Sequence, residues 1–546
     1  MKKITLLFAL LTCFYANAQW TTDTAVNTLV INKISSDSQS IATSDGKTFI
    51  VFWKQVPAPI NFELRVQLLD SDGYQQFGPE GMLISNTIPM STSTVIWKIA
   101  IDSQNSLYVG ATGTANGAGN PGFVYKISSN GTMLWGQNGI SLGAAYLPTM
   151  LPLANGDVII NYWTGNGQSK IQRFTSDGAP IWATPVSVMS DNGTNATTPA
   201  NMYELSNQEI MVVFHKKLSF GVASNLFAQK YNANGIAQWA APTQLSNKGT
   251  AYNSLYSSTQ DGNVIYYGYS GATGTRYDSY LQRINTDGTI PWGINGVDFD
   301  TNQTFYEMDT KVACTPGSQY VWSISKYTTS SQSSTGEFVQ KFDKITGERQ
   351  FTANAKQVYP VNTNYKNHTG DLYLVNDNPY FLIKSGIDNG VSPIPLNMVQ
   401  LDSNGNFSWP EEFLPVATFS ASKGRIVLNK PFNNESVVVF VEEKMSGEPR
   451  IYAQKFISPA LSTNDFEVTD SFQLYPNPTN AIFTIKGNTS IQSVSIYNAL
   501  GQQIYSNETA YTAKLTIGTN DWAKGLYIVN VATDNGIQKT IKLIKN

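Results

Sequence analysis

The chain has 546 residues and a formal net charge of −3, with 36 Lys and Arg against 39 Asp and Glu. Neither sign of charge is concentrated, so composition gives no reason to expect binding to nucleic acid or to an anionic membrane. Charged residues make up only 14% of the chain while aromatic residues reach 12% and glycine occurs 42 times, a mixture typical of a turn-rich all-β protein.

The N-terminus has the three parts of a secretory signal peptide. A Lys-Lys pair supplies positive charge, the run ITLLFALL is apolar, and Ala-Asn-Ala supplies small side chains for cleavage. The apolar run is too short to span a membrane. We therefore expect a signal peptide over residues 1–18, with cleavage between Ala18 and Gln19.

A hairpin motif recurs along most of the chain, for example FVYKISSNGTMLWG at 123–136 and LQRINTDGTIPWG at 281–293. A β-type run enters a tight turn that ends in glycine, and an aromatic residue stands four residues later. The glycines are Gly73, Gly131, Gly178, Gly235, Gly288, Gly347 and Gly405, and the aromatics are Phe77, Trp135, Trp182, Trp239, Trp292, Phe351 and Trp409. Successive glycines are 47 to 59 residues apart. A repeat with this spacing indicates a solenoid or a propeller.

Ahead of each hairpin lies another pair of β-type runs joined by a tight turn. These pairs are centred on 40–53, 99–110, 151–163, 203–214, 256–268, 312–324, 372–383 and 426–440. No stretch has a sustained helical period with caps. Each unit therefore contains four strands, and four-stranded sheets repeated around an axis form a β-propeller.

The two ends of the repeat region predict how the ring closes. The eighth unit reaches a third strand, RIYAQKF at 450–456, but lacks the glycine turn and the aromatic that follows it. Trp20 begins a run that resembles the segments after Trp135 and Trp292. We therefore expect eight blades over residues 19–457, closed by an N-terminal strand that removes an open edge, with seven blades as the alternative.

These repeats resemble two known groups. VYKISSNGTMLWG and FVQKFDKITGERQF are similar to the repeats of quinoprotein-like eight-bladed propellers, in which a tryptophan packs between neighbouring blades. LWGQNGI, QFGPEGM and PWGINGV resemble the delta-60 repeats of secreted bacterial proteins. The resemblance implies a propeller and no particular activity, because one fold hosts many functions.

The chain changes character after the last repeat. Residues 458–470 are polar and uneven and are expected to be a linker. Residues 471–546 contain half-buried alternating strands and tight turns that predict a small antiparallel β-sandwich.

This tail closely resembles the type A C-terminal sorting domain of the type IX secretion pathway in Bacteroidetes. The residues that carry the resemblance are Tyr475, Pro476, Asn477, Pro478, Gly501, Gly525, Tyr527 and Lys542. The resemblance implies export through the periplasm to the cell surface or the medium. It also implies that the type IX translocon and its cargo-binding outer-membrane components are partners of this domain.

Catalytic groups are sparse. The chain has two histidines, His215 and His368, which is too few for a His-rich metal site, and the sequence predicts no catalytic residue, metal or cofactor. Once the signal peptide is removed Cys314 is the single cysteine, so no intrachain disulfide is expected. The sequence does not exclude a pair of catalytic carboxylates like that of glycosidases. The available acids include Asp309, Asp377, Asp388, Glu411, Glu412, Glu442 and Glu443, and nothing in their spacing selects a pair.

A ligand is expected on one rim of the propeller. The connections between second and third strands, and between blades, are often long, and binding residues concentrate on loops held by a rigid scaffold. The candidate ligand-binding residues at the ends of second strands are Trp53, Tyr162, Trp163, His215, Tyr267 and Tyr269. The recurrent turn acids and tryptophans of the hairpin are instead interpreted as scaffold.

Together these features predict a secreted or cell-surface protein that binds a glycan or protein ligand without catalysis. A component of a larger surface assembly is a second possibility. The alternative is a secreted glycan-active enzyme with carboxylates in the propeller funnel, which convergence of three or more acidic groups there would favour.

Overall fold

The computed structural model describes residues 20–58, 61–91, 98–165, 167–189, 196–217, 223–251, 256–386, 393–459, 473–508, 512–533 and 538–546. The expected signal peptide with its cleavage site at Ala18 and Gln19, Asp388 and most of the expected linker lie outside these residues. The chain divides into two compact units, residues 1–459 and 460–546. A search of the described residues for a helix able to cross a membrane found none.

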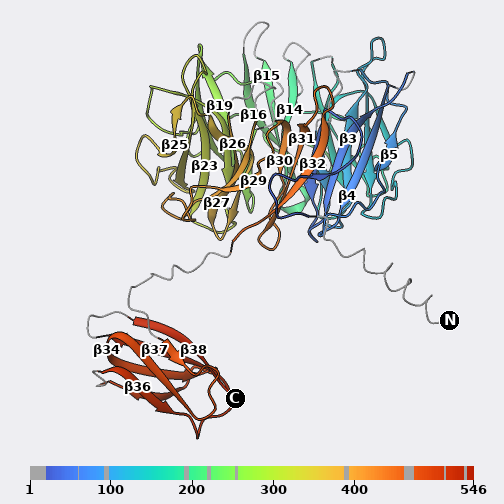
Figure 1. Ribbon diagram of the computed structural model, residues 1–546. Coiled ribbons are helices and arrows are strands. Elements are labelled where there is room, and N and C mark those ends of the chain that lie inside the picture. The colour runs from blue at the N-terminus through green and yellow to red at the C-terminus, as the bar shows by residue number, and fades with distance from the viewer. Residues whose placement is uncertain are drawn as a thin grey trace, which may run out of the picture. The chain divides into compact units, whose positions relative to one another are not determined.

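The described part of the first unit forms eight four-stranded antiparallel sheets, the blades of a propeller (Figure 1). Blade 1 is β2 (Ser38–Ala42), β3 (Thr48–Gln55), β4 (Phe62–Leu69) and β5 (Met82–Ser85). Blade 2 is β6 (Ile99–Ile101), β7 (Leu107–Thr112), β8 (Pro121–Ile127) and β9 (Ile140–Ala144). Blade 3 is β10 (Tyr146–Pro152), β11 (Val158–Trp163), β12 (Ser169–Phe174) and β13 (Val186–Ser187). Blade 4 is β14 (Thr197–Glu204), β15 (Ile210–Lys217), β16 (Ser224–Tyr231) and β17 (Thr243–Gln244), with a short 3-10 turn η1 (Ser206–Gln208) between its first two strands.

The remaining blades repeat this order. Blade 5 is β18 (Ser258–Asp261), β19 (Val264–Thr273), β20 (Arg276–Ile284) and β21 (Val297–Asp298). Blade 6 is β22 (Tyr306–Ala313), β23 (Tyr320–Thr328), β24 (Thr335–Asp343) and β25 (Lys356–Asn362). Blade 7 is β26 (Lys366–Val375), β27 (Asn378–Ser385), β28 (Leu396–Gln400) and β29 (Leu414–Ala417). Blade 8 is β30 (Ser422–Leu428), β31 (Glu435–Glu443), β32 (Arg450–Ile457) and, from the N-terminus, β1 (Thr28–Leu29).

The closing strand confirms the expected blade count of eight. Thr28 pairs with Ala453 and Leu29 with Tyr452, so the first described strand completes the last blade. In Figure 1 the orange strands β31 and β32 accordingly lie next to the blue strands of blade 1. The seven-bladed alternative is wrong, because the eighth unit forms a full sheet once β1 is added.

The middle strands of the blades are buried on both faces, which explains their continuous apolar runs. β3 reads TFIVFWKQ with its first six residues buried, and β15 reads IMVVFHKK with the same pattern. The first strands of neighbouring blades contact one another and so surround the axis. Several of them are bulged, including β14 between Pro199 and Met202 and β22 between Met308 and Lys311.

The second unit is a six-stranded sheet that curls into a nearly closed, barrel-like layer. Its strands are β33 (Gln473–Tyr475), β34 (Ile482–Asn498), β35 (Gln503–Asn507), β36 (Thr512–Gly518), β37 (Gly525–Thr533) and β38 (Gln538–Lys545). The first half of the long β34 pairs with β33 and β36, and its second half pairs with β35 and β37. The two halves enclose a core that includes Phe483, Val494 and Val529, which is the sandwich-like fold expected from the sequence.

Candidate functional site

A pocket of about 340 Å³ opens on the rim where second strands end and third strands begin, which we call the long-loop rim. It lies over blades 4, 5 and 6, and we call it the rim pocket. Its lining combines small and hydroxyl side chains with two tyrosines, one acid and one lysine. The lining residues are Ala223, Gly249, Thr250, Ala251, Tyr256, Ser257, Ser270, Ala272, Tyr277, Met308, Asp309, Thr310 and Lys311.

The bulge in β22 places the charged groups of this pocket. Asp309 has a positive φ of 56°, which turns its side chain out of the strand so that 60% of its surface is open to solvent. Lys326 Nζ lies 2.8 Å from the Asp309 carboxylate. Desolvation by the surrounding blades raises the pKa of Asp309, but the charge of Lys326 and then that of His368 outweigh it and leave the pKa at about 2. Asp309 is therefore ionised at neutral pH.

Three of the residues predicted from the sequence meet beneath the rim pocket. The rings of His215, Tyr267 and Tyr269 lie 5.8, 6.2 and 6.3 Å from the ring of Tyr256. All three are fully buried, whereas Tyr256 is half-buried and reaches the pocket. The structure therefore places the three as a buried support for Tyr256.

Hydrogen bonds hold this aromatic support in place. His215 Nδ1 lies 3.1 Å from Thr250 Oγ1, and the Tyr269 hydroxyl donates to the Asn295 carbonyl at 2.9 Å. The Tyr256 hydroxyl accepts from the Ala251 N–H at 3.3 Å. Burial raises the pKa of Tyr269 far above its usual range, so that group stays neutral.

The other predicted binding residues lie elsewhere on the same rim. Trp53 lines a separate pocket on blade 1 and is 5% exposed. Tyr162, also 5% exposed, and the half-buried Trp163 stand at the end of β11 in blade 3. The Trp163 ring lies 5.1 Å from that of Tyr146. These residues are not brought to the rim pocket.

Three carboxyl groups converge between blades 5 and 6. Oxygens of Asp298, Asp300 and Glu307 lie within 4.8 Å of one another, a spacing at which they could share a metal ion. The Tyr327 hydroxyl donates to Asp300, and the Ser279 N–H donates to Glu307 at 3.1 Å.

Burial keeps protons on this acidic group. Burial, with the Asp300 charge, raises the pKa of Glu307 well above its usual range, and burial with the Asp278 charge raises the pKa of Asp298 to about 6. The raised pKa values of Glu307 and Asp298 favour a proton shared between carboxyl groups of this cluster.

A histidine–carboxylate pair lies between blades 6 and 7. His368 Nδ1 is 2.9 Å from Glu337 Oε1, and the His368 N–H donates to Glu337 Oε2 at 2.9 Å. Both residues are buried, and His368 Nε2 has no hydrogen-bond partner. A carboxylate in this position orients the imidazole. His368 also lowers the pKa of Asp309 through its charge. The sequence carried no local signal for this pair, because its members come from strands of different blades.

The residues that resembled a sorting motif lie together in the second unit. Asn477 Nδ2 donates to the Lys542 carbonyl at 2.8 Å, so the segment Tyr475–Pro478, with its two cis peptides, is tied to β38. Gly501 has a φ of 79° in the turn after β34, and Gly525 begins β37. The buried Tyr527 donates from its hydroxyl to Ala523 at 2.6 Å.

Two solved structures illustrate how the chain compares with known folds. The Dos1 propeller is 11% identical, with 78% of this chain and 94% of that chain covered and a TM-score of 0.42. The polysaccharide lyase Uly1 is also 11% identical, with coverage of 81% and 94% and a TM-score of 0.43.

A curated relative corrects the expected function. Over 91 residues the chain is 36% identical to ulvan lyase NLR42 of Nonlabens ulvanivorans. This match spans 16% of the chain and 17% of the relative. Because the relative bears the name of an enzyme, the preference for a non-catalytic binding or adhesion protein over a secreted glycan-active enzyme is wrong. The chain spans about a sixth of the length of that relative.

The C-terminal resemblance is confirmed. Residues 473–546 match the family model of the secretion system C-terminal sorting domain. The second unit, with Asn477 tied to β38 and the Gly501 turn, is therefore that sorting domain, and the chain is exported by type IX secretion to the cell surface or the medium.

Proposed function

We propose that this protein is a secreted glycan-active enzyme whose active centre is the rim pocket. Three observations support the proposal: export to the cell exterior, the enzyme name of the curated relative, and a pocket that joins an ionised acid, a lysine and two tyrosines. The pocket carries the argument, because it brings Tyr256, with its buried aromatic support, to the same cavity as Lys311.

The pocket's side chains favour elimination over hydrolysis. Glycoside hydrolysis uses two carboxyl groups on either side of the scissile bond. Among the described residues that line the rim pocket, Asp309 is the one carboxylate, and it is paired with Lys326. Elimination from a uronic acid instead needs a cation for the sugar carboxylate and a group that moves a proton, and both are present.

The proposed reaction assigns one role to each group. Lys311 binds the uronate carboxylate and stabilises the negative charge that develops on it. Tyr256, as a phenolate that accepts the Ala251 N–H, takes the proton from C5 of the uronate. A C4–C5 double bond forms as the C4–O4 bond breaks, and Tyr256 returns the proton to O4. Tyr277, 38% exposed, offers a ring face at the pocket mouth.

The test uses the purified full chain with ulvan, polygalacturonate, alginate and xylan. We expect new reducing ends together with the ultraviolet absorbance of an unsaturated sugar on a uronate polymer. Tyr256→Phe should lower kcat by about 100-fold or more, the scale of a lost acid–base group. Tyr146→Phe on blade 3, outside the rim pocket, is the matched control and should keep full activity. Reducing ends without that absorbance would replace elimination by hydrolysis, and no cleavage of any polymer would overturn the proposal.

We also propose that residues 473–546 bind the type IX translocon and its cargo-binding outer-membrane components. The support is the match to the sorting-domain family and the hydrogen bonds that join Asn477 to Lys542 and Ile544 of β38.

A further inference from the structure

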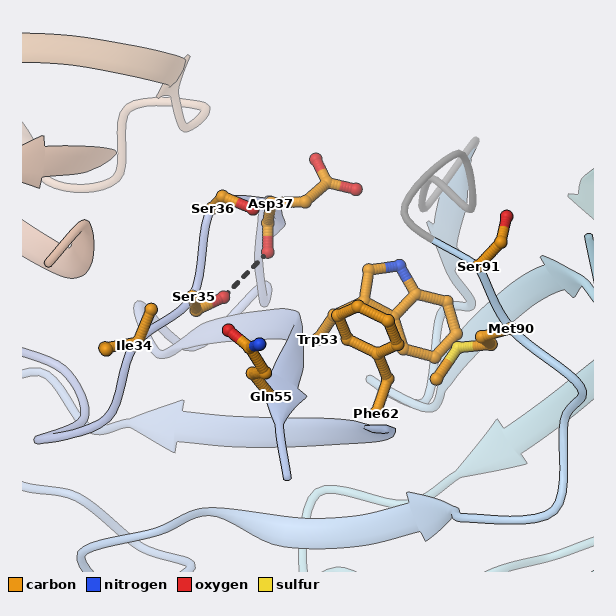
Figure 2. A pocket seen from close by; sticks show the side chains of 9 residues that line it. All are labelled: Ile34, Ser35, Ser36, Asp37, Trp53, Gln55, Phe62, Met90 and Ser91. Carbon is orange, nitrogen blue, oxygen red and sulfur yellow. Dashed lines mark hydrogen bonds between the residues drawn. The ribbon is translucent and has the colours of Figure 1, made fainter. Parts of the chain in front are cut away.

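A second pocket, of about 170 Å³, opens on the long-loop rim of blade 1 (Figure 2). We call it the blade 1 pocket. Trp53, Phe62 and Met90 form one side of it, and Ser36, Asp37 and Gln55 stand on the other. One wall is thus apolar and aromatic while the opposite wall is polar.

Trp53 carries a hydrogen-bond donor with no acceptor. Its side chain is 5% exposed, and its Nε1 is buried without a partner. In Figure 2 the ring nitrogen lies on the same side of the indole as the Ser91 hydroxyl. A buried unpaired N–H costs about 1–3 kcal/mol, so this donor is poised for a ligand acceptor.

Four of the five hairpin tryptophans differ from Trp53 in this respect, whereas Trp409 Nε1 is likewise buried without a partner. The ring N–H of Trp135 donates to the Ser176 carbonyl at 2.9 Å, and that of Trp182 donates to Ala233 at 2.9 Å. Those donors are satisfied by the neighbouring blade. Trp53 is distinguished from Trp409 by its position, since the Trp53 ring forms a pocket wall.

The polar wall is held in a fixed position. The Arg425 Nε lies 2.9 Å from the Asp37 carboxylate, and the Ser35 hydroxyl donates to the Asp37 carbonyl at 3.2 Å. Asp37 is 7% exposed, while Gln55 is open to solvent. Acceptors from Asp37 and the amide of Gln55 thus face an aromatic wall across a cavity the size of one small ring.

We infer that the blade 1 pocket is a sugar subsite that takes one neutral pyranose unit of a polysaccharide. A pyranose has a C–H face that packs on an aromatic ring and an edge of hydroxyls for Asp37, Gln55 and the Trp53 N–H. The inference rests on the proposed function, because the same polymer would be cleaved in the rim pocket. Blades 1 and 5 lie opposite one another in a ring of eight, so a chain that fills both pockets crosses the funnel mouth.

The experiment measures binding separately from turnover. Retention of the full chain in native gels that contain ulvan or xylan reports affinity for the polymer. Trp53→Phe keeps an aromatic ring but removes the N–H, and Gln55→Ala removes an exposed amide without touching the core. We expect each variant to weaken retention by about tenfold, the scale of one hydrogen bond, and to raise KM for the polymer. Trp135→Phe, the same change in a hairpin of blade 2, should leave retention unaltered.

The outcomes separate the subsite from the proposed function. Unchanged retention of both variants, with cleavage intact, would overturn the subsite and leave the enzyme. Weakened retention of both variants in a protein that cleaves no polymer would uphold the subsite while the proposed reaction fails. Melting temperatures of the variants show whether they are folded. If Trp53→Phe does not fold, the retention of Gln55→Ala tests the subsite by itself. Loss of retention in Trp135→Phe as well would assign the effect to blade packing and overturn the inference.

Discussion

At the scale of single residues, the propeller is locked by one contact that recurs between neighbouring blades. In six of the seven hairpins the aromatic residue packs on the turn glycine of the next blade. A Cβ at Gly288 would lie 2.9 Å from the Trp239 ring, and one at Gly178 would lie 3.1 Å from Trp135. The Trp239 N–H also donates to the Thr286 carbonyl in the same turn at 3.3 Å. The turn thus needs glycine for two reasons: its φ is positive, and a Cβ would collide with the aromatic ring that covers the turn.

The contact predicts how two glycines of one blade differ. Gly288 and Gly293 have φ values of 86° and 78°, but a Cβ at Gly293 meets nothing within 4 Å. Gly293→Ala should cost about 1–2 kcal/mol of unfolding free energy from backbone strain alone. Gly288→Ala should cost about 1–3 kcal/mol more, because the Trp239 ring must move. Denaturant unfolding of both variants measures the difference, and equal losses would contradict the blade contact.

At the scale of the element, the closing strand is attached to blade 8 by a buried charge. Glu442 is fully buried. Its carboxylate accepts a hydrogen bond at 3.0 Å from Nδ2 of Asn27, the residue that precedes β1. Lys423 Nζ lies 2.9 Å from Glu442, and both side chains are inaccessible to solvent. Burial lowers the pKa of Lys423, while the Glu442 charge opposes that shift. The pair therefore ties β30, β31 and the N-terminal segment together.

Removing one partner of this pair should be costly. Lys423→Met leaves the buried Glu442 carboxylate with Lys444, whose Nζ lies 3.3 Å away, as its remaining cation, and is expected to lower the unfolding free energy by about 1.5–3 kcal/mol. The double variant Lys423→Met/Glu442→Gln removes both charges, keeps an acceptor for Asn27, and should recover most of that loss. Denaturant titration of the single and double variants is the measurement. A double variant as unstable as the single one would contradict the role assigned to the charge.

At the scale of the whole molecule, the chain combines a closed ring with a sorting domain that is a compact unit of its own. The hydrophobic clusters of the propeller are formed from its own blades, and the sorting domain encloses a separate core around Phe483 and Val529. Folding of the ring therefore does not depend on contacts made by the core of the tail.

Deletion of residues 471–546 should trap the protein in the periplasm. Cell fractionation of the producing bacterium, with immunodetection of the propeller, measures where the truncated chain accumulates. Protease resistance of the retained protein controls for folding, because the truncated ring keeps all eight blades. Secretion of the truncated chain at the level of the full chain would refute the export role of the tail.

The ring and its closure were predictable because each depends on local patterns. The tight turn with its aromatic recurs in the sequence, and its absence from the last unit pointed to Trp20 and the strand that follows. The sorting domain was equally readable, since its motif residues lie in turns and at strand ends whose spacing is local. Backbone period and turn chemistry act over a few residues, so they survive in a single sequence.

Tertiary structure alone decided what surrounds the site. His215, Tyr267 and Tyr269 were predicted as ligand contacts, yet the packing of blades 4 and 5 buries them beneath Tyr256. The pairing of His368 with Glu337 joins strands of adjacent blades that no local pattern relates. Whether a residue at the end of a strand is buried or lines a pocket depends on the neighbouring blade, and the local pattern of a sequence does not encode that neighbour's surface.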